Sequence, residues 1–390
     1  MNLSNELEND NQEISSFEEL NLKQNLLRGI YNYGFEKPSE IQKRAIKPLI
    51  EKHDVIGQAQ SGTGKTATFS ISMLQRIDEN ENKTQAIIMS HTRELSLQIN
   101  NVVRDLSTYM NLNITLCVGG TSIRDNIYEL NKNPHLVIGT PGRILDMINK
   151  KALNTRYLKL FIIDEADEML SKIFLNQIYD IFRFLPQDIQ VGLFSATMTN
   201  EFFDLTKKFM RDPIKVLVKN DQLTLEGIKQ FYVNVQLNEY KFDCLCDLFE
   251  IISISQTIIY CNSKRSVIDL VSKLEKDDFS VLMMHGDMSQ EERNEIMVKF
   301  RNGEGRIMVS TDLLARGIDI QQISIVLNYD LPNSIENYIH RIGRSGRYGR
   351  KGTAINFATD ADSKKVEELE QFYSTQIEEL PAKNILMNMI

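Results

Sequence analysis

The chain has 390 residues, a formal net charge of −8 and 42% hydrophobic residues, values that favour a soluble globular protein with two domains. The net negative charge argues against a uniformly basic surface that would bind nucleic acid non-specifically, but it is compatible with a local basic groove. No apolar run is long enough to span a bilayer, and the polar N-terminus is not a signal peptide. Four scattered cysteines without metal-ligand spacing indicate buried thiols in a reducing compartment.

The N-terminal part begins with an apolar-poor stretch. Residues 1–15 are rich in Asn, Glu and Ser and are predicted to form a disordered tail, and ordered structure begins near Phe17. Further on, Ser39 and Gln42 have the spacing of a capping box at a helix start. The Gln42 amide also offers the donor and the acceptor that are needed to recognise adenine. The local sequence leaves these two roles of Gln42 equally open.

A phosphate-binding loop follows. The apolar run Val55-Ile56 precedes the sequence AQSGTGKT at 59–66, and a segment that favours helix comes next. The glycines allow backbone N–H groups to face an anion, and the helix start adds its positive dipole end. The pattern therefore predicts that Lys65 reaches the terminal phosphates and that the Thr66 hydroxyl ligates Mg²⁺. The general motif has Gly where Ala59 stands, so a flexible loop is the alternative.

Apolar strands then alternate with helices, which favours an α/β fold with a parallel sheet covered on both faces. The strands predicted for the first half are 86–90, 114–118, 136–139, 160–163 and 191–194. Ligands of such sheets bind at the carboxyl ends of the strands. The polar motifs that follow these strands are therefore candidates for a functional site.

The strand 160–163 runs directly into Asp164-Glu165-Ala166-Asp167. Carboxylates at the end of a buried strand are costly unless a cation lies opposite. Asp164 is therefore predicted to hold Mg²⁺, and Glu165 is predicted to orient the attacking water. An acidic helix N-terminus is the alternative, which the upstream phosphate-binding loop makes less favourable.

The chain is predicted to divide into domains at 16–215 and 228–390, joined by a linker at 216–227. The second domain again alternates strands with helices, with strands at 231–233, 257–260, 281–284, 306–309, 323–327 and 353–357. It has no phosphate-binding loop, but Arg344 and Arg347 alternate with glycines after His340. Such arginines suit a split active site in which the second domain supplies arginine fingers. A solvated helix end is the alternative.

Together these motifs resemble the core of the DEAD-box RNA helicases over residues 17–390. In chain order they are the Gln42 motif, AQSGTGKT, TREL, GG, TPGR, DEAD, SAT, TDLLARGID and HRIGRSGR. The resemblance implies two tandem RecA-like domains, ATP and Mg²⁺ as cofactors, and ATP hydrolysis coupled to RNA binding. It also favours adenine recognition as the role of Gln42.

The resemblance assigns residues around the nucleotide. The residues expected to contact adenine or ribose are Phe35, Lys37, Gln42, Asp319 and Tyr348. The residues expected to hold the phosphates are Gly62, Thr63, Gly64, Lys65, Thr66 and Ala67. The catalytic group comprises Lys65, Asp164, Glu165, His340, Arg344 and Arg347, with Thr66 and Asp164 on the metal. Ser195 and Thr197 are expected to couple the ATP state to RNA binding.

Single-stranded RNA is expected to cross both domains. The matching positions are Thr92, Arg93, Gly120, Thr140 and Arg143 in the first domain, and Asn262, Gly286, Arg293 and Thr311 in the second. Hydroxyls, amides and arginines suit contacts with phosphates and 2′-hydroxyls, which give a preference for RNA without base readout.

Three positions depart from the family pattern. His91 and Thr199 stand where the family usually has Pro, and Ile173 stands where it usually has Gly. None of these departures removes a chemical group, and drift in a divergent lineage is the favoured interpretation.

The predicted function is ATP-dependent unwinding of short RNA duplexes, most simply in translation initiation on mRNA 5′ regions. The expected protein is a cytoplasmic monomer that works with a HEAT-repeat initiation scaffold and other initiation factors. The main alternative is a nuclear, ATP-gated RNA clamp of the exon-junction type with low turnover, and a DNA helicase is a weaker one. The translation helicase and the RNA clamp both need every motif, so the sequence does not decide between these two functions.

Overall fold

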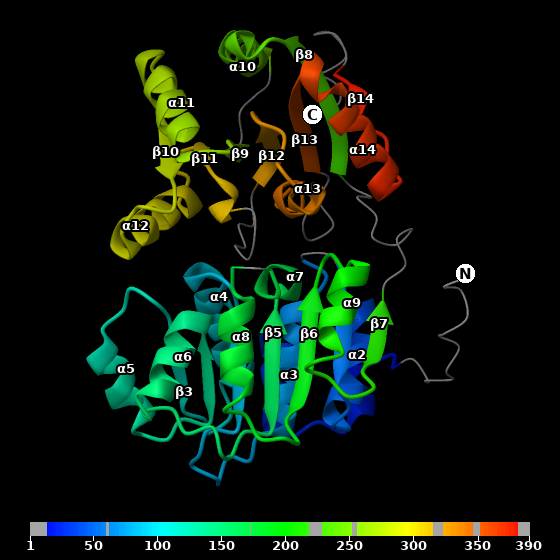
Figure 1. Ribbon diagram of the computed structural model, residues 1–390, viewed down its shortest axis with the longest axis vertical. Helices are drawn as coiled ribbons and strands as arrows, with labels where there is room; N and C mark the ends of the chain where they lie inside the picture. Colours follow the sequence, from blue (N-terminus) through cyan, green and yellow to red (C-terminus); the bar gives the residue numbers. More distant parts are fainter. Residues whose placement is uncertain are drawn as a thin grey trace. The chain divides into compact units, whose positions relative to one another are not determined.

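The computed structural model describes residues 14–59, 62–171, 173–217, 228–251, 256–314, 323–345 and 352–380. The described residues form two compact units, one containing 14–59 and 63–217 and the other containing the residues from 228 onward. Each unit is a seven-stranded sheet with helices on both faces (Figure 1). No helix in the described part of the chain is long and apolar enough to cross a membrane.

The first unit alternates strands with helices after a short N-terminal helical region. Its strands are β1 (Val55–Gln58), β2 (Ala86–Met89), β3 (Ile114–Cys117), β4 (Leu136–Gly139), β5 (Leu160–Asp164), β6 (Gln190–Ser195) and β7 (Ile214–Leu217). Its helices are η1 (Phe17–Leu20), α1 (Gln24–Asn32), α2 (Glu40–Ile50), α3 (Lys65–Arg76), α4 (Arg93–Leu106), α5 (Ile123–Leu130), α6 (Pro141–Asn149), α7 (Ala166–Met169), α8 (Leu175–Phe182) and α9 (Asn200–Thr206).

The strands of the first unit are all parallel and lie in the order β3-β4-β2-β5-β6-β1-β7. The central strands are buried along their whole length because helices cover both faces. On one face α2 packs on α3 and α3 on α4, and elsewhere α6 packs on α8. The parallel arrangement brings every strand's carboxyl end to one edge, which is where the polar motifs begin.

The second unit is built in the same way. Its strands are β8 (Ile228–Gln236), β9 (Gln256–Tyr260), β10 (Val281–Met284), β11 (Ile307–Ser310), β12 (Ile323–Asn328), β13 (Gly352–Thr359) and β14 (Glu378–Glu379). Its helices are η3 (Asn238–Tyr240), α10 (Lys241–Ile251), α11 (Lys264–Lys276), α12 (Gln290–Arg301), η4 (Asp312–Leu314), α13 (Ile335–Ile342), η5 (Asp360–Asp362) and α14 (Ser363–Tyr373).

The two units share one topology. The second sheet has the order β10-β11-β9-β12-β13-β8-β14, and all its strands are parallel. Counted within each unit, both sheets place the third, fourth, second, fifth, sixth, first and seventh strands side by side. The second unit is therefore a structural repeat of the first. The predicted pair of parallel α/β sheets is confirmed.

The ends of the first unit differ in detail from the sequence prediction. Ile14 is buried and the Ser15 N–H donates to the Glu19 carboxylate at 3.3 Å, although both residues were predicted to belong to the tail. Strand β7, which was not predicted, pairs with β1 and includes Val216 and Leu217 of the predicted linker. The remaining parts of the predicted tail and linker, 1–13 and 218–227, lie outside the described residues.

The four cysteines form no disulfide. Cys117 and Cys261 are buried, and burial raises the pKa of each thiol to about 12. Cys244 and Cys246 are partly exposed rather than buried. The prediction of buried thiols therefore holds for Cys117 and Cys261 but not for Cys244 and Cys246.

Candidate ATP site and RNA-binding surface

The phosphate-binding loop joins the carboxyl end of β1 to the start of α3. Gly62 and Gly64 have φ angles of +85° and +102°, a conformation that favours glycine, so the tight turn accounts for both. Lys65 is the first residue of α3 and is 6% exposed. Its Nζ atom is buried and has no hydrogen-bond partner among the described residues. A buried cation without an acceptor is costly, so this loop is prepared for an anion.

Gln42 connects helix α2 to this loop. Its Oε1 accepts a hydrogen bond from the Ser39 N–H at 2.9 Å, within the predicted capping box. Its Nε2 donates to the Gly64 carbonyl at 3.4 Å, and a Cβ on Gly64 would lie only 2.6 Å from Nε2. The amide has two donor and two acceptor positions, and these contacts use one of each. The capping role of Gln42 is confirmed. Its recognition of adenine stays a prediction, and the amide keeps one donor and one acceptor position for it.

The other adenine candidates of the first unit lie in the loop between α1 and α2. The Phe35 ring is half-buried, with its centroid 4.8 Å from that of Tyr33, and Lys37 is exposed. Both precede Ser39, the residue that Gln42 contacts. The chain therefore brings an aromatic ring and an exposed cation to the segment next to the phosphate-binding loop, and their contacts with adenine stay predictions.

The acidic motif lies at the carboxyl end of β5. Asp164 is the last residue of β5, and Glu165 precedes α7 with φ 50° and ψ 53°. The Glu165 N–H donates to Asp164 Oδ1 at 3.0 Å. Burial raises the pKa of the Asp164 carboxyl, the charge of Glu165 raises it further, and Lys65 opposes both effects. The loop lysine and the acidic motif thus lie close enough to interact.

The donor set of this site suits a hard divalent cation. Mg²⁺ prefers oxygen ligands, and the site offers the Asp164 carboxylate and the Thr66 hydroxyl beside Lys65. A cation next to Asp164 would offset the repulsion between Asp164 and Glu165 that raises the Asp164 pKa. These residues therefore fit Mg²⁺ bound together with a nucleotide.

The SAT motif is tied to the acidic motif. Ser195 ends β6, which pairs with β5. Its Oγ donates to the Thr197 carbonyl at 2.8 Å and accepts from the Thr197 N–H at 3.2 Å. Thr197 Oγ1 in turn donates to Asp167 Oδ2 at 2.5 Å. This chain of contacts gives the predicted coupling residues a direct connection to the acidic motif.

The three departures from the family pattern are accommodated locally. Thr199 caps α9, because its Oγ1 accepts from the Phe202 N–H at 3.3 Å, an interaction that Pro cannot make. Ile173 is 72% exposed and so does not disturb the core. His91 is half-buried in the turn before α4.

The RNA-binding candidates of the first unit follow β2, β3 and β4, which lie side by side in the sheet. Thr92 caps α4 by accepting from the Leu95 N–H at 3.2 Å. The Arg93 guanidinium packs over Gly119 and Gly120, and a Cβ on Gly120 would lie 2.1 Å from Arg93 Nη1. Gly120 also has a φ of +78°. The glycine pair thus provides both the turn and the room for Arg93.

Arg143 is turned inward. It is 9% exposed, and its guanidinium donates to Thr121 Oγ1 at 3.0 Å, to the Thr121 carbonyl at 2.8 Å and to Asn126 Oδ1. Thr140 Oγ1 accepts from the Gly119 N–H at 3.4 Å. Arg143 therefore supports the loop that carries Gly120, and its direct contact with RNA stays a prediction.

The candidates of the second unit occupy the equivalent edge. Asn262, Gly286 and Thr311 follow β9, β10 and β11, which are neighbours in the second sheet. Arg293 donates to the Gly286 carbonyl, and Ser310 Oγ donates to the Thr311 carbonyl at 3.0 Å. The predicted RNA contacts of each unit therefore gather on the same side of its sheet.

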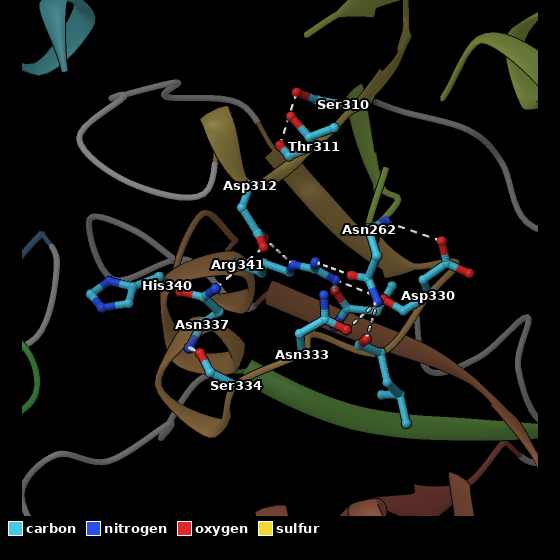
Figure 2. A network of polar contacts seen from close by, with 12 residues as sticks. Asn262, Ser310, Thr311, Asp312, Asp330, Asn333, Ser334, Asn337, His340 and Arg341 are labelled. Atoms are coloured by element: carbon cyan, nitrogen blue, oxygen red, sulfur yellow. Dashed lines mark hydrogen bonds and ion pairs between the residues drawn. The ribbon is translucent and has the colours of Figure 1, made fainter. Parts of the chain in front are cut away.

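Arg341 of α13 organises this edge of the second unit (Figure 2). It is fully buried and donates to Asn262 Oδ1 at 2.7 Å, to the Asp330 carbonyl at 2.7 Å and to Asn328 Oδ1 at 3.2 Å. It also forms an ion pair with Asp312. In the sequence, Arg341 is one of several closely spaced arginines in the motif HRIGRSGR. Local sequence does not distinguish a buried arginine from exposed ones, so this role of Arg341 was not predicted.

The remaining predicted catalytic residues lie in or after α13. Figure 2 shows His340 pointing away from the partners of Arg341. Arg344 follows one turn later, and its Nε donates to the His340 carbonyl at 3.1 Å. Asp319, Arg347 and Tyr348 lie outside the described residues, so their contacts with ribose, γ-phosphate and adenine stay predictions.

This pair of sheets and its motifs match known families. Residues 39–205 match the DEAD/DEAH box helicase family, and residues 240–349 match the helicase conserved C-terminal domain. The chain is 57% identical to eukaryotic initiation factor 4A of Caenorhabditis elegans, over 96% of this chain and 93% of that protein. It is 58% identical to the ATP-dependent RNA helicase eIF4A of Pyricularia oryzae, over 96% of this chain and 94% of that protein. The chain belongs to the DEAD/DEAH box helicase family.

Solved structures of the family share the fold. S. cerevisiae Dbp5 bound to RNA and ADP BeF3 matches with a TM-score of 0.89 and 35% identity, covering 96% of this chain and 98% of that chain. Mss116p bound to ssRNA and AMP-PNP matches with a TM-score of 0.86 and 28% identity, covering 97% and 82%. The predicted fold class, two tandem RecA-like domains, is confirmed.

Proposed function

We propose that this protein is an ATP-dependent RNA helicase of the initiation factor 4A type, which separates short RNA duplexes locally. The observation that carries this proposal is that the buried Lys65 Nζ, which lacks a hydrogen-bond partner among the described residues, converges with Asp164 and Glu165 at one sheet edge. The RNA-binding candidates follow the neighbouring strands of the same edge. The high identity to eIF4A proteins of other organisms supports the same function.

The residues of the first unit divide the work on the nucleotide. Lys65 pairs with the terminal phosphates, and Thr66 and Asp164 hold Mg²⁺, which neutralises phosphate charge when bound. Glu165 orients the attacking water and accepts its proton. Gln42 recognises adenine with the donor and acceptor positions that its capping contacts leave unused. The Thr197–Asp167 hydrogen bond ties the predicted coupling residues Ser195 and Thr197 to the acidic motif.

RNA binds along the backbone rather than through base edges. Thr92, Arg93 and Gly120 of the first unit and Asn262 and Thr311 of the second offer hydroxyls, amides and a guanidinium. Such groups recognise phosphates and 2′-hydroxyls, so the protein prefers RNA to DNA without reading sequence. Simultaneous binding of RNA to both units bends one strand, and ATP hydrolysis then releases it.

The second unit completes the active site with Arg344 and Arg347 as arginine fingers. The cellular setting that we infer is translation initiation in the cytoplasm, with a monomer that is held by a HEAT-repeat initiation scaffold. This inference is supported by the similarity to initiation factor 4A of other organisms. A nuclear RNA clamp with low turnover is the alternative outcome of the experiment.

RNA-stimulated ATP turnover of the purified full chain tests the function. We expect single-stranded RNA to stimulate turnover and matched DNA to have little effect, and Lys65→Ala to abolish turnover. Lys207→Ala, at a 76% exposed surface lysine, is the matched control and should behave as wild type. Turnover that stays negligible with RNA and is suppressed further by partners would identify a clamp. Equal stimulation by DNA would contradict the RNA assignment.

A further inference from the structure

The first unit contains a cavity that nothing in the proposed function uses. It has a volume of about 780 Å³ and is lined in part by Lys52, His53 and Asp54 before β1, Leu158 and Lys159 before β5, and Gln190 at the start of β6. In a parallel sheet these positions lie at the amino edge, whereas the phosphate-binding loop lies at the carboxyl edge. The volume is in the range of small-molecule sites.

Arg76 is the residue that makes this cavity unusual. It is the last residue of α3, lines the cavity and is partly buried. Its Nη1 atom is buried, and within the described part of the chain its side chain has no hydrogen bond or ion pair. Burial lowers the pKa of the guanidinium, and no neighbouring carboxylate opposes that effect. A partly buried guanidinium without an acceptor is costly, which indicates an anionic partner.

The helix dipole does not account for Arg76. A cation near a helix C-terminus can be stabilised by the last carbonyl groups. At the end of α3, however, Lys23 has that role, because its Nζ donates to the Leu74 carbonyl at 3.3 Å and to the Ile77 carbonyl. Arg76 is thus an additional cation that the fold itself does not require.

Gln190 supplies a second unpartnered group in the wall of the same cavity. It is 4% exposed, and its Nε2 donates to the Leu49 carbonyl at 3.1 Å and to the His53 carbonyl. These two contacts set the orientation of the amide. Its buried Oε1 is left without a donor among the described residues. A donor and an acceptor that both lack partners indicate a ligand that carries an anionic group and a hydroxyl.

The other charges of the cavity are compatible with such a ligand. The Asp54 carboxylate accepts from the Val191 and Arg211 N–H groups, both at 2.8 Å, so it is already used by the fold. Lys159 pairs with Glu81 outside the lining at 2.8 Å. Lys52 and the Arg211 side chain add cations, and the exposed Asp188 and Asp212 add acceptors for further hydroxyls.

We propose that this cavity is a second ligand site, for a small hydroxylated oxyanion such as a sugar phosphate or a hydroxycarboxylic acid. The planar guanidinium of Arg76 binds the oxyanion through paired N–H groups, which match the geometry of phosphate and carboxylate oxygens. The ligand hydroxyl donates to Gln190 Oε1. Phosphate and carboxylate ligands share this chemistry, and the two probes of the experiment distinguish them.

Titration calorimetry on the full chain tests this site. Saturating ADP and Mg²⁺ occupy the phosphate-binding loop, and the probes are glycerol 3-phosphate and malate. We expect one probe to bind saturably and Arg76→Gln to weaken it at least about tenfold, because a charge-assisted hydrogen bond is lost. ADP affinity should be unchanged in this variant. Arg183→Gln, at a 77% exposed arginine, is the matched control and should bind like wild type.

Two results would overturn the site. Equal affinity of wild type and Arg76→Gln would mean an adventitious ion only, and no saturable binding of either probe would mean that the cavity holds no such ligand. The thermal midpoint without probe checks the fold. We expect Arg76→Gln to be at least as stable as wild type, because no partner is lost. A clear loss of stability together with lost ADP binding would make Arg76 a structural residue and refute the proposal.

Discussion

Glu165 shows how a single residue is placed by the turn that contains it. Its left-handed backbone is uncommon for a residue with a side chain and is held by the N–H bond to Asp164 Oδ1. Strain of this kind persists where the surroundings impose it, and it is concentrated at functional sites. The turn directs the chain away from β5 at Glu165, the carboxylate that we propose orients the attacking water.

Replacing Glu165 by Gln is expected to slow ATP hydrolysis by ~10²-fold or more, because only the base that orients the water is lost. ATP binding should stay near wild type, and RNA should be held longer. Single-turnover hydrolysis and equilibrium binding of a labelled ATP analogue measure the two effects. Glu168→Gln, one residue after the motif, is the control and should hydrolyse normally. A collapse of ATP affinity in Glu165→Gln would instead identify Glu165 as a metal-binding or structural residue.

The pKa of Asp164 makes the metal-free protein sensitive to pH. An acid whose pKa is raised on folding binds more protons in the folded state. Stability is therefore lost as pH rises from the ordinary aspartate value of 3.8 through the raised folded value. Above that range Lys65 offsets the buried charge only in part unless a cation is bound. Asp164→Asn has no ionisable group at this position, so the variant should not lose stability in this way as pH rises.

In EDTA, Asp164→Asn is expected to be more stable than wild type at pH 8, by at least about 1.4 kcal/mol, the free energy of one pKa unit. The difference should shrink towards pH 5. Thermal unfolding over this pH range measures it, with Asp105→Asn at an exposed aspartate as the control. A constant difference at all pH values would contradict the raised pKa.

At the scale of elements, the carboxyl edge of each sheet is divided by strand order. In the first unit the phosphate-binding loop, the acidic motif and the SAT motif follow β1, β5 and β6, while the RNA-binding candidates follow β2, β3 and β4. Strands β2 and β5 are neighbours, so the two groups meet at the middle of the sheet. Within the nucleotide group, the hydrogen bond from Thr197 to Asp167 joins the turns that follow β6 and β5.

Arg341 performs the corresponding task in the second unit. Its side chain joins α13 to the turns after β9, β11 and β12 through Asn262, Asp312 and Asp330. Lysine has one point charge and cannot reproduce this planar set of donors. Arg341→Lys is therefore expected to lower the free energy of unfolding by about 2–4 kcal/mol, since several charge-assisted hydrogen bonds are lost.

Urea unfolding of the full chain measures this loss, and RNA affinity should fall with it because Asn262 loses its support. Arg183→Lys at an exposed position should change stability by less than about 0.5 kcal/mol. Unchanged unfolding of Arg341→Lys would mean that the network contributes nothing to the second unit.

At the scale of the whole molecule, the two units use one topology for different tasks. Lys65 and Lys241 are each the first residue of the helix that follows the first strand of a unit. Lys65 Nζ lacks a partner among the described residues, but Lys241 Nζ pairs at 2.9 Å with Asp330, which follows β12, the counterpart of β5. In the second unit the Lys241 ammonium is therefore neutralised by Asp330, whereas we propose that the equivalent Lys65 ammonium of the first unit binds phosphate. This difference is consistent with our proposal that the second unit contributes arginines rather than a nucleotide loop.

Arg347→Ala tests whether the second unit completes the site. If Arg347 is an arginine finger, the full-length variant should lose ~10³-fold in ATP turnover while it keeps its fold. A fragment of residues 1–217, which retains the complete first sheet with β7, should bind ATP weakly and hydrolyse almost none. RNA-stimulated turnover and titration with an ATP analogue and labelled RNA measure both proteins.

Normal hydrolysis in Arg347→Ala, combined with weak RNA binding in every nucleotide state, would make Arg347 an RNA-backbone contact. Lys229→Ala in the same unit is the control and should leave turnover unchanged. A fragment that hydrolyses ATP at the rate of the full chain would contradict the split site altogether.

Much of this architecture could be predicted from the sequence, because its signals are local. Continuous apolar strands followed by polar motifs indicated two parallel sheets, and the spacing around Gly64 and Lys65 indicated the phosphate-binding loop. The capping box of Ser39 and Gln42 was likewise predicted and is present. Each of these features depends on residues within a few positions of one another.

Tertiary structure alone decided which polar residues share an environment. The burial of Arg341 and Arg143, the pairing of Lys241 with Asp330 and the missing partners of Arg76 depend on segments that are distant in sequence. The edge strand β7 was also missed: its sequence Ile-Lys-Val-Leu suits a strand, but only the pairing with β1 shows that it belongs to the first sheet rather than to the linker. A basic run in the sequence does not reveal which arginine is enclosed, since burial is set by the packing of whole elements.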